Sequence, residues 1–436
     1  MRSKDVIFFT FFLFNIVIGI AQQTISISLN EVLAKVEGNN YTIKISVEDF
    51  KAAKADFNQT NAILLPSISI FHTGITTTNP LMAFGSKLNQ EILTPADFDP
   101  TLLNNPKETQ SYATKIEVKQ PILNFDGMLM RKAAKAKMNA LQLKSARTKN
   151  YINLEVTKAF MQLQVAYKAV EVLNKAKEAA LANKKMAEDN FKQGYLQKAD
   201  MLSVAVHLTE VENKLLSAKS NVKNASDYVL FLMGDDNSKL LKPSSILIAK
   251  IDTAIFNQPF STNRDDINAM QKSTDAFNYM YKASKNTYLP KLNAFGSYEM
   301  YDHQLFGTQA KGYLVGAQLS WNVFEGFKRI GKIQKGKAEY DKAQLSFEQY
   351  KNKSLLEFNQ AKRQLKDAEN KLKLTKLAVA QSKEELRIRT NRFKQGLEKT
   401  ADLLTTETKY LQKQLENLQT VFSYNYSKAY VEFLLK

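Results

Sequence analysis

Few side chains in this 436-residue sequence could carry out chemistry. There is no cysteine, which excludes disulfides, thiolate metal sites and catalytic thiols. The three histidines, His72, His207 and His303, lie far apart in the sequence, and none has a partner at metal-ligand spacing. The glycine-rich phosphate loop and the G-x-S-x-G and H-E-x-x-H motifs do not occur either. We therefore expect no enzyme, no metal centre and no cofactor.

Two aspartates occupy the same place in a repeated segment. An N-F-K-Q-G run ending at Gly194 precedes Asp200, and an R-F-K-Q-G run ending at Gly396 precedes Asp402. Equivalent residues of the two runs are 202 positions apart. Glycine commonly ends a helix in the left-handed conformation, and an aspartate shortly afterwards is typical of a helix N-cap. Each copy therefore predicts a helix, a glycine turn and a returning helix.

The helices that flank the glycine turns are predicted to be very long. Residues 128–193, 195–233 and 397–436 contain neither glycine nor proline, and 327–395 contains only two glycines near its start. At about 1.5 Å per residue, 128–193 would span about 99 Å. Apolar residues recur along it at alternating spacings of four and three, which predicts side-by-side helix packing. They are Ile152, Val156, Ala159, Leu163, Ala166, Val170 and Leu173.

The rest of the chain is organised around these two hairpins. Basic residues followed by an apolar stretch and small residues at the N-terminus predict an export signal. A capping box at Ser28 begins a predicted helix, which a Leu-Pro pair ends after Leu64. The expected parts are a signal peptide at 1–21, repeat 1 at 22–234, an inter-repeat link at 235–262 wrapped on the outside, and repeat 2 at 263–436.

Four segments instead alternate apolar and polar residues, as strands do. Tyr313 and Trp321 lie on one apolar face, eight residues apart, as expected for aromatic residues at the two membrane interfaces. Four strands cannot close a barrel, so insertion into a membrane would need strands from two or more chains. A soluble antiparallel sheet packed on a helix is the alternative. The predicted strands are 67–73, 112–122, 291–301 and 312–323.

The connection between the first two strands is longer than its counterpart in the second repeat by 25 residues, which fall within 76–109. Long loops of membrane barrels face the outside. We therefore expect the outer loop 76–109 to contact lipopolysaccharide, to form a mobile cap, or to be a tolerated surface loop.

The formal net charge of +18 could indicate a nucleic acid, an anionic membrane surface or simple solubility. Lysines and arginines are spread along the helical patterns among acids, and no docking motif accompanies them. We therefore expect solvated helix faces and no nucleic-acid partner, with a secreted polyanion binder as a minor rival.

In this order, these features resemble the TolC family of outer-membrane efflux ducts over essentially all of the mature chain. The runs Q-P-I-L-N-F-D-G at 120–127 and S-W-N-V-F-E-G at 320–326 look like the strand-to-helix signature of that family. The two glycine tips and the Leu-Pro stops also match it. The resemblance covers both repeats and is carried by the order of motifs that are individually weak.

The resemblance implies a mainly α-helical chain that contributes four strands to a trimeric, twelve-stranded β-barrel in the lipid of the outer membrane, continuous with a long α-helical barrel in the periplasm. The homotrimer would conduct substrates passively for an efflux or type I secretion system. Its periplasmic tips would dock onto an adaptor, the membrane fusion protein, which joins it to an inner-membrane pump.

The resemblance also implies site residues. The adaptor-docking tips would comprise Phe191, Gly194, Leu196, Phe393, Gly396 and Leu397. The periplasmic mouth would comprise Asp200, Asp402 and Thr405. Asp402 matches the first acid of a family ring, but Thr405, one turn on, departs from a double ring of acids. Glu398 stands where a basic gate-locking partner can occur in the family.

A periplasmic coiled-coil scaffold or adaptor without membrane strands is the main rival function. An adaptor would carry a single hairpin that splits a lipoyl-like domain, whereas this sequence predicts two hairpins and four alternating segments. The sequence therefore favours the outer-membrane duct.

Overall fold

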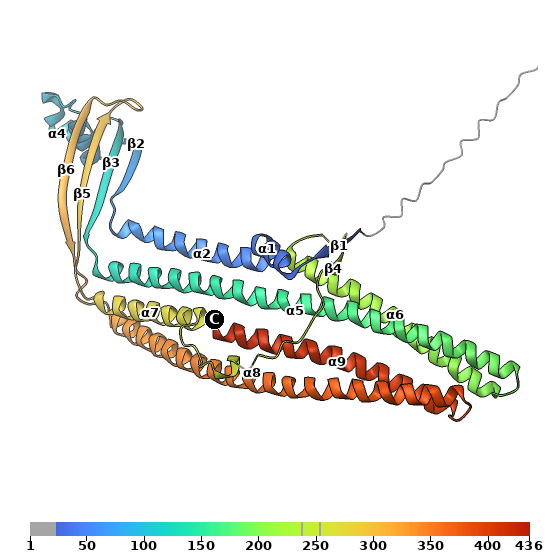
Figure 1. Ribbon diagram of the computed structural model, residues 1–436. Coiled ribbons are helices and arrows are strands. Elements are labelled where there is room, and N and C mark those ends of the chain that lie inside the picture. Colours follow the sequence, from blue (N-terminus) through green and yellow to red (C-terminus); the bar gives the residue numbers. More distant parts are fainter. Residues whose placement is uncertain (1–22, 237–238, 253) are drawn as a thin grey trace, which may run out of the picture. The chain divides into compact units, whose positions relative to one another are not determined.

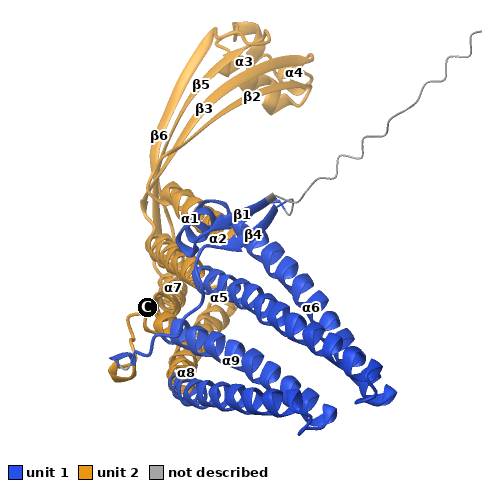
Figure 2. Ribbon diagram, turned by 45° about the vertical axis from the view of Figure 1, so that its right-hand side comes forward, with its two compact units in different colours: residues 1–41, 152–255, 362–431 blue, residues 42–151, 256–361, 432–436 orange. Residues whose placement is uncertain are grey.

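A computed structural model describes residues 23–236, 239–252 and 254–436. The predicted export signal at 1–21 lies outside these residues. The chain forms two compact units (Figure 2), and each draws segments from both repeats. Unit 1 takes its described residues from 1–41, 152–255 and 362–431, and unit 2 comprises 42–151, 256–361 and 432–436.

The two predicted hairpins are confirmed. Each consists of a very long helix, a short turn around a glycine and a returning helix of 36 residues (Figure 1). The long helices contain 68 and 67 residues, or about 100 Å each at the usual helical rise. The four helices are α5 (Phe125–Lys192), α6 (Lys198–Met233), α8 (Lys328–Lys394) and α9 (Thr400–Leu435).

The core of unit 1 lies between helices of both hairpins. The heptad stripe of α5 is buried at Val156, Ala159 and Leu163, as the spacing predicted. Further along, residues of α5, α6 and α9 form one apolar cluster, so the first hairpin packs on the returning helix of the second. The cluster contains Val172, Leu173, Val211, Leu215, Ala218 and Leu411.

The four alternating segments form one antiparallel sheet in unit 2, in the order β2-β3-β5-β6. β2 and β6 are its edges, and neither pairs with a further strand among the described residues. The predicted strands are all present, although the last ends at Ser320, before Trp321. The strands are β2 (Ser67–Thr77), β3 (Thr109–Leu123), β5 (Lys291–Asp302) and β6 (Ala310–Ser320).

The predicted single helix from Ser28 to Leu64 is wrong, because Asn40 interrupts it. The capping box forms as predicted, with the backbone N–H of Ser28 donating to Glu31 Oε2 at 2.7 Å. Asn40 is extended, and its side-chain Nδ2 donates to the carbonyl of Leu232 at 2.8 Å. This distant bond competes with helix continuation. The segment is α1 (Leu29–Asn39), α2 (Tyr41–Gln59) and the 3₁₀ turn η1 (Thr60–Ile63).

The inter-repeat link contributes a strand that the sequence did not reveal. β4 pairs in parallel with β1, near the start of the described chain. The hydroxyl of Ser226 accepts from the backbone N–H of Leu241 at 2.8 Å and ties β4 to α6. The elements here are β1 (Gln23–Ile27), β4 (Lys239–Pro243), the turn η3 (Ala254–Asn257) and α7 (Asp265–Asn286).

The predicted outer loop is largely helical. It folds at the end of the sheet away from α2 and α5 (Figure 2). Its elements are α3 (Pro80–Asn89), the turn η2 (Pro95–Phe98) and α4 (Pro100–Asn104). In the part of the chain that the structure describes, no helix combines the length and apolarity needed to cross a membrane.

Candidate functional site

Both hairpin tips use the same backbone geometry. Gly194 and Gly396 have φ values of 80° and 74°, the left-handed region that glycine adopts without strain. The N–H of Tyr195 donates to the carbonyl of Asn190 at 2.9 Å, and the N–H of Leu397 donates to that of Arg392 at 2.9 Å. These are the six-to-one bonds of a Schellman motif, which explains why the glycine ends each long helix.

The residue after each glycine is the most prominent apolar side chain of its tip. Tyr195 is 80% exposed and Leu397 is 64% exposed, although residues at this position of a Schellman motif usually pack back on the helix. Leu397 was predicted as a tip residue. The predicted set contained Leu196 and not Tyr195. The 202-residue offset between the repeats aligns Tyr195 with Leu397, and this alignment is the sequence signal that identifies Tyr195.

The two predicted phenylalanines differ between the tips. Phe191 is exposed, whereas Phe393 is only 8% exposed and supports its tip from inside. In this conformation Phe393 therefore offers little surface to a partner, in contrast to the prediction that it lines the docking tip. Leu196 is half-buried.

Among the described residues, an ionic clamp occurs at the second tip and not at the first. The half-buried Glu398 binds Arg389 Nη1 at 2.7 Å and Arg392 Nε at 3.1 Å. Arg392 also donates to the carbonyl of Leu397. The equivalent of Glu398 in the first tip is Leu196, so the first tip cannot form this clamp.

The two predicted mouth aspartates lie in the first turns of α6 and α9, at the third helical position. They are therefore not N-caps, and the N-cap interpretation is wrong: the N-cap of α6 is Gln197. Their negative charges still interact favourably with the positive helix N-terminus. Neither Asp200 nor Asp402 makes an ion pair with another described residue. Asp402 is exposed and Asp200 half-buried, while the hydroxyl of Thr405 donates to the carbonyl of Ala401.

A polar contact joins the two hairpins about two turns from the tips. His207 Nε2 of α6 lies 3.3 Å from Glu407 Oε2 of α9. Asn183 of α5 donates to the other carboxylate oxygen of Glu407. The side chains of His207 and Glu407 are both nearly buried. No local pattern in the sequence predicts this contact, because Glu407 lies 200 positions from His207 and 224 positions from Asn183.

The sheet has one apolar and one polar face. Ile70, Ile116, Tyr298 and Tyr313 lie in one cross-strand row of the apolar face. The predicted interface residues Tyr313 and Trp321 are both exposed, and the indole of Trp321 donates to the carbonyl of Tyr288 at 2.9 Å. The polar face carries the ion pairs Lys115–Glu299 and Lys119–Glu117, each at 3.1 Å.

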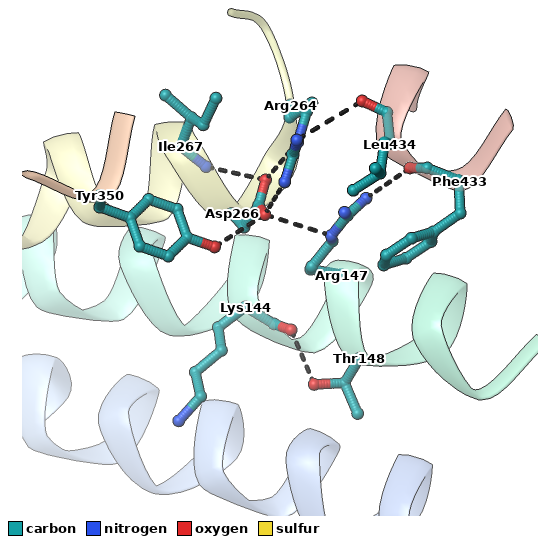
Figure 3. A network of polar contacts seen from close by, with 9 residues as sticks. All are labelled: Lys144, Arg147, Thr148, Arg264, Asp266, Ile267, Tyr350, Phe433 and Leu434. Carbon is teal, nitrogen blue, oxygen red and sulfur yellow. Dashed lines mark hydrogen bonds and ion pairs between the residues drawn. The ribbon is translucent and has the colours of Figure 1, made fainter. Parts of the chain in front are cut away.

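A buried network in unit 2 holds the last turn of α9 (Figure 3). Asp266 binds Arg264 Nη2 at 2.5 Å and Arg147 Nε at 3.4 Å, and Tyr350 donates to it at 2.8 Å. Arg147 and Arg264 also donate to the carbonyls of Phe433 and Leu434. Cationic groups stabilise such carbonyls at a helix C-terminus.

This network shifts the protonation of its members. Burial works to raise the pKa of the Asp266 carboxyl, but the hydrogen bonds and charges of Arg264, Tyr350 and Arg147 outweigh burial and lower it. Burial, followed by the bond to Asp266, raises the pKa of Tyr350 to about 12. Asp266 is therefore ionised and Tyr350 protonated throughout the neutral pH range.

The chain therefore combines an open four-stranded sheet with helices about 100 Å long. A family model described as "Outer membrane efflux protein" matches residues 32–235 and 260–430. The chain belongs to this family. Among curated protein sequences, none matches it.

Solved structures share the fold at low sequence identity. The CmeC outer membrane channel of Campylobacter jejuni has a TM-score of 0.80 and 16% identity, over 93% of this chain and 85% of that chain. The outer membrane protein VceC of Vibrio cholerae has a TM-score of 0.79 and 15% identity, over 93% and 95%. The open state of the MtrE outer membrane channel of Neisseria gonorrhoeae has a TM-score of 0.75 and 13% identity, over 93% and 88%.

Family membership identifies the protein as an outer-membrane efflux channel that extends into the periplasm, and not as an enzyme. The predicted fold class and duct function are confirmed, and the rival scaffold without membrane strands is not supported. As a class, channels of this family form trimers and work with adaptor proteins and inner-membrane pumps. No group of three or more potential metal ligands occurs among the described residues.

Proposed function

We propose that this chain works as a homotrimer whose twelve strands close a barrel in outer-membrane lipid. The observation that carries this proposal is the pair of free edges, β2 and β6, of a four-stranded sheet with one exposed apolar face. Open edges are not tolerated in lipid, and a closed barrel needs at least eight strands. Two or more chains of four strands satisfy both requirements, and the choice of three rests on the family, whose channels form trimers. The polar face would line the lumen.

The second part of the proposal is that the hairpin tips dock a periplasmic adaptor, which an inner-membrane pump energises. The exposed side chains of Tyr195 and Leu397 support it, because an apolar residue at this position normally packs on its own helix. Tyrosine in particular is enriched among the few residues that carry most of the energy of protein interfaces. The channel itself would then conduct passively.

The double variant Tyr195→Asp/Leu397→Asp tests the docking. We expect it to lower the amount of adaptor that copurifies with the channel from cross-linked cells by about 30-fold, as for the loss of about 2 kcal/mol of interface energy. The control Tyr195→Phe keeps the apolar ring and should retain the adaptor. The mass of the detergent-extracted particle shows whether each variant is still a trimer. Undiminished adaptor in the trimeric double variant would refute docking through these side chains.

A further prediction concerns the mouth. Three copies of the exposed Asp402 would place three carboxylates around the periplasmic opening, and rings of acids favour cations. We therefore expect Asp402→Asn to lower the cation-to-anion permeability ratio in planar bilayers. Asp275→Asn removes a carboxylate from α7, outside the two hairpins, and is the control. An unchanged ratio would mean that Asp402 only stabilises the start of α9.

A further inference from the structure

The segment between β2 and β3, residues 78–108, is a folded element that we call the outer cap. Lys87 Nζ lies 2.7 Å from Asp97 Oδ1, and the rings of Phe84 and Phe98 meet edge to face at 5.6 Å. The Lys87 bond, together with bonds from Thr94, lowers the pKa of Asp97 to about 2. These contacts fix α3 against η2, so the outer cap has a defined shape, unlike the mobile cap that was one expectation.

The outer cap lies against the sheet at the outer end of β3, on the polar face. The β2–β3 register is regular from Ser67–Lys119 to Thr77–Thr109, so Thr109 lies on the same face as Lys119, and so does Ser111. Thr109 and Ser111 are both buried, in contrast to most of the sheet.

The helix that covers this face is α3. Its inward side chains Ala83 and Ser86 are buried, and so is its C-cap residue Gln90, whose Nε2 donates to the carbonyl of Gln110 at 3.0 Å. Since the polar face of a membrane barrel lines the lumen, α3 would lie over the outer end of that lumen.

The opposite side of α3 is apolar and uncovered. Leu81 is 81% exposed, and Met82 and Leu88 are also exposed. The only charged residue of α3 is Lys87, which is paired with Asp97. An amphipathic helix normally buries its apolar side, whereas α3 buries Ala83 and Ser86 and exposes Leu81, Met82 and Leu88. Exposed apolar side chains that lie together usually mark a contact surface, so another surface should cover them.

We propose that the outer caps of three copies of this chain meet through Leu81, Met82 and Leu88 and form an apolar constriction across the outer end of the lumen. This inference rests on the proposed trimer. Membrane lipid is a less suitable occupant, because lipid would contact the opposite face of the sheet, where Tyr313 is exposed. In a cyclic trimer, by contrast, three elements that fold inward converge on the axis. Apolar constrictions of this kind close channels to water and ions.

The absence of cysteine from the sequence makes a direct test available. Leu81→Cys and Leu88→Cys are each prepared as single-cysteine trimers and treated with a short bismaleimide. Lys107→Cys is the matched control, because Lys107 is an exposed residue of the same outer cap. We expect about tenfold more covalently linked chains from Leu81→Cys and Leu88→Cys than from Lys107→Cys, because converging caps raise the local thiol concentration.

The mass of the untreated particle separates the two proposals. A trimer in which positions 81 and 88 link no better than position 107 would overturn the constriction and leave the duct intact. A particle that is not trimeric would overturn the proposed function as well. If thiols at 81 and 88 resist a bulky maleimide in the outer membrane but do not link chains, lipid covers α3 and the inference is also overturned.

Discussion

Replacing Asp266 by asparagine is expected to destabilise the protein by about 3 kcal/mol, because it leaves the guanidinium groups of Arg147 and Arg264 in a buried site without their anion. The side chain of Arg264 is almost fully buried, so water cannot replace the lost carboxylate. The loss would also loosen the last turn of α9, whose carbonyls accept from the same two arginines. The measurement is the thermal unfolding midpoint of the detergent-solubilised protein, followed by its helical signal.

The pH dependence of this effect has a defined sign. The pKa of Asp266 is lowered below its ordinary value of 3.8, so its contribution is fully present above pH 3.8 and is lost as the pH falls through the lowered pKa. The difference between wild type and Asp266→Asn should therefore be constant around neutral pH and shrink only in strong acid. A difference that already vanished near neutral pH would contradict this account.

The control for this experiment is Asp275→Ala in the same helix, α7. Asp275 makes only solvent-accessible contacts with Lys272 and Gln271, and such pairs contribute about 0–1 kcal/mol. If Asp266→Asn proved as stable as Asp275→Ala, Arg147 and Arg264 would have found other partners, which would contradict the prediction.

Replacing Glu407 by alanine is expected to release the first hairpin from α9 near the tips. The substitution leaves the side-chain amide of Asn183 without its acceptor and removes the carboxylate that lies beside His207 in a nearly buried site. An unsatisfied buried polar group costs about 2 kcal/mol, which raises the population of the locally opened hairpin about 30-fold. Trypsin cleavage at Lys184 and Lys185 reports that population, since proteolysis follows the open fraction when closing is fast.

Glu416→Ala is the matched control, because Glu416 lies on the same helix and makes an exposed pair with Lys413. Its cleavage rate should equal that of wild type. The cleavage rate of Glu407→Gln should lie between those of Glu407→Ala and Glu416→Ala, since the amide oxygen of the new glutamine still accepts from Asn183. Equal cleavage of all three variants would mean that apolar packing alone joins the hairpins.

The sequence predicted those parts of the fold that local patterns determine. The long helices follow from the absence of glycine and proline, the tips from Gly194 and Gly396, and the strands from alternation. The combination of four strands with two hairpins also predicted the correct family and its function as an outer-membrane duct.

Contacts between distant residues could not be predicted in this way. Asn40 breaks a helical pattern because it finds the carbonyl of Leu232, 192 positions away. The pairing of β4 with β1 and the Glu407 contact are equally remote in sequence. The outer cap was missed for a different reason: its helices are short, and their proline and asparagine content is typical of loops.

The unlike tips of the two hairpins have a consequence for stoichiometry. Three copies of the chain would present six tips that share the backbone turn at glycine and therefore offer an approximately sixfold ring. The chemistry of the ring is only threefold, because a clamped Glu398 alternates with an apolar Leu196. A ring of six identical adaptor subunits would then bind through two kinds of contact, three of each. The six adaptor subunits would not be equivalent. A mutation could weaken the three contacts of one kind while the three contacts of the other kind kept the adaptor ring on the channel.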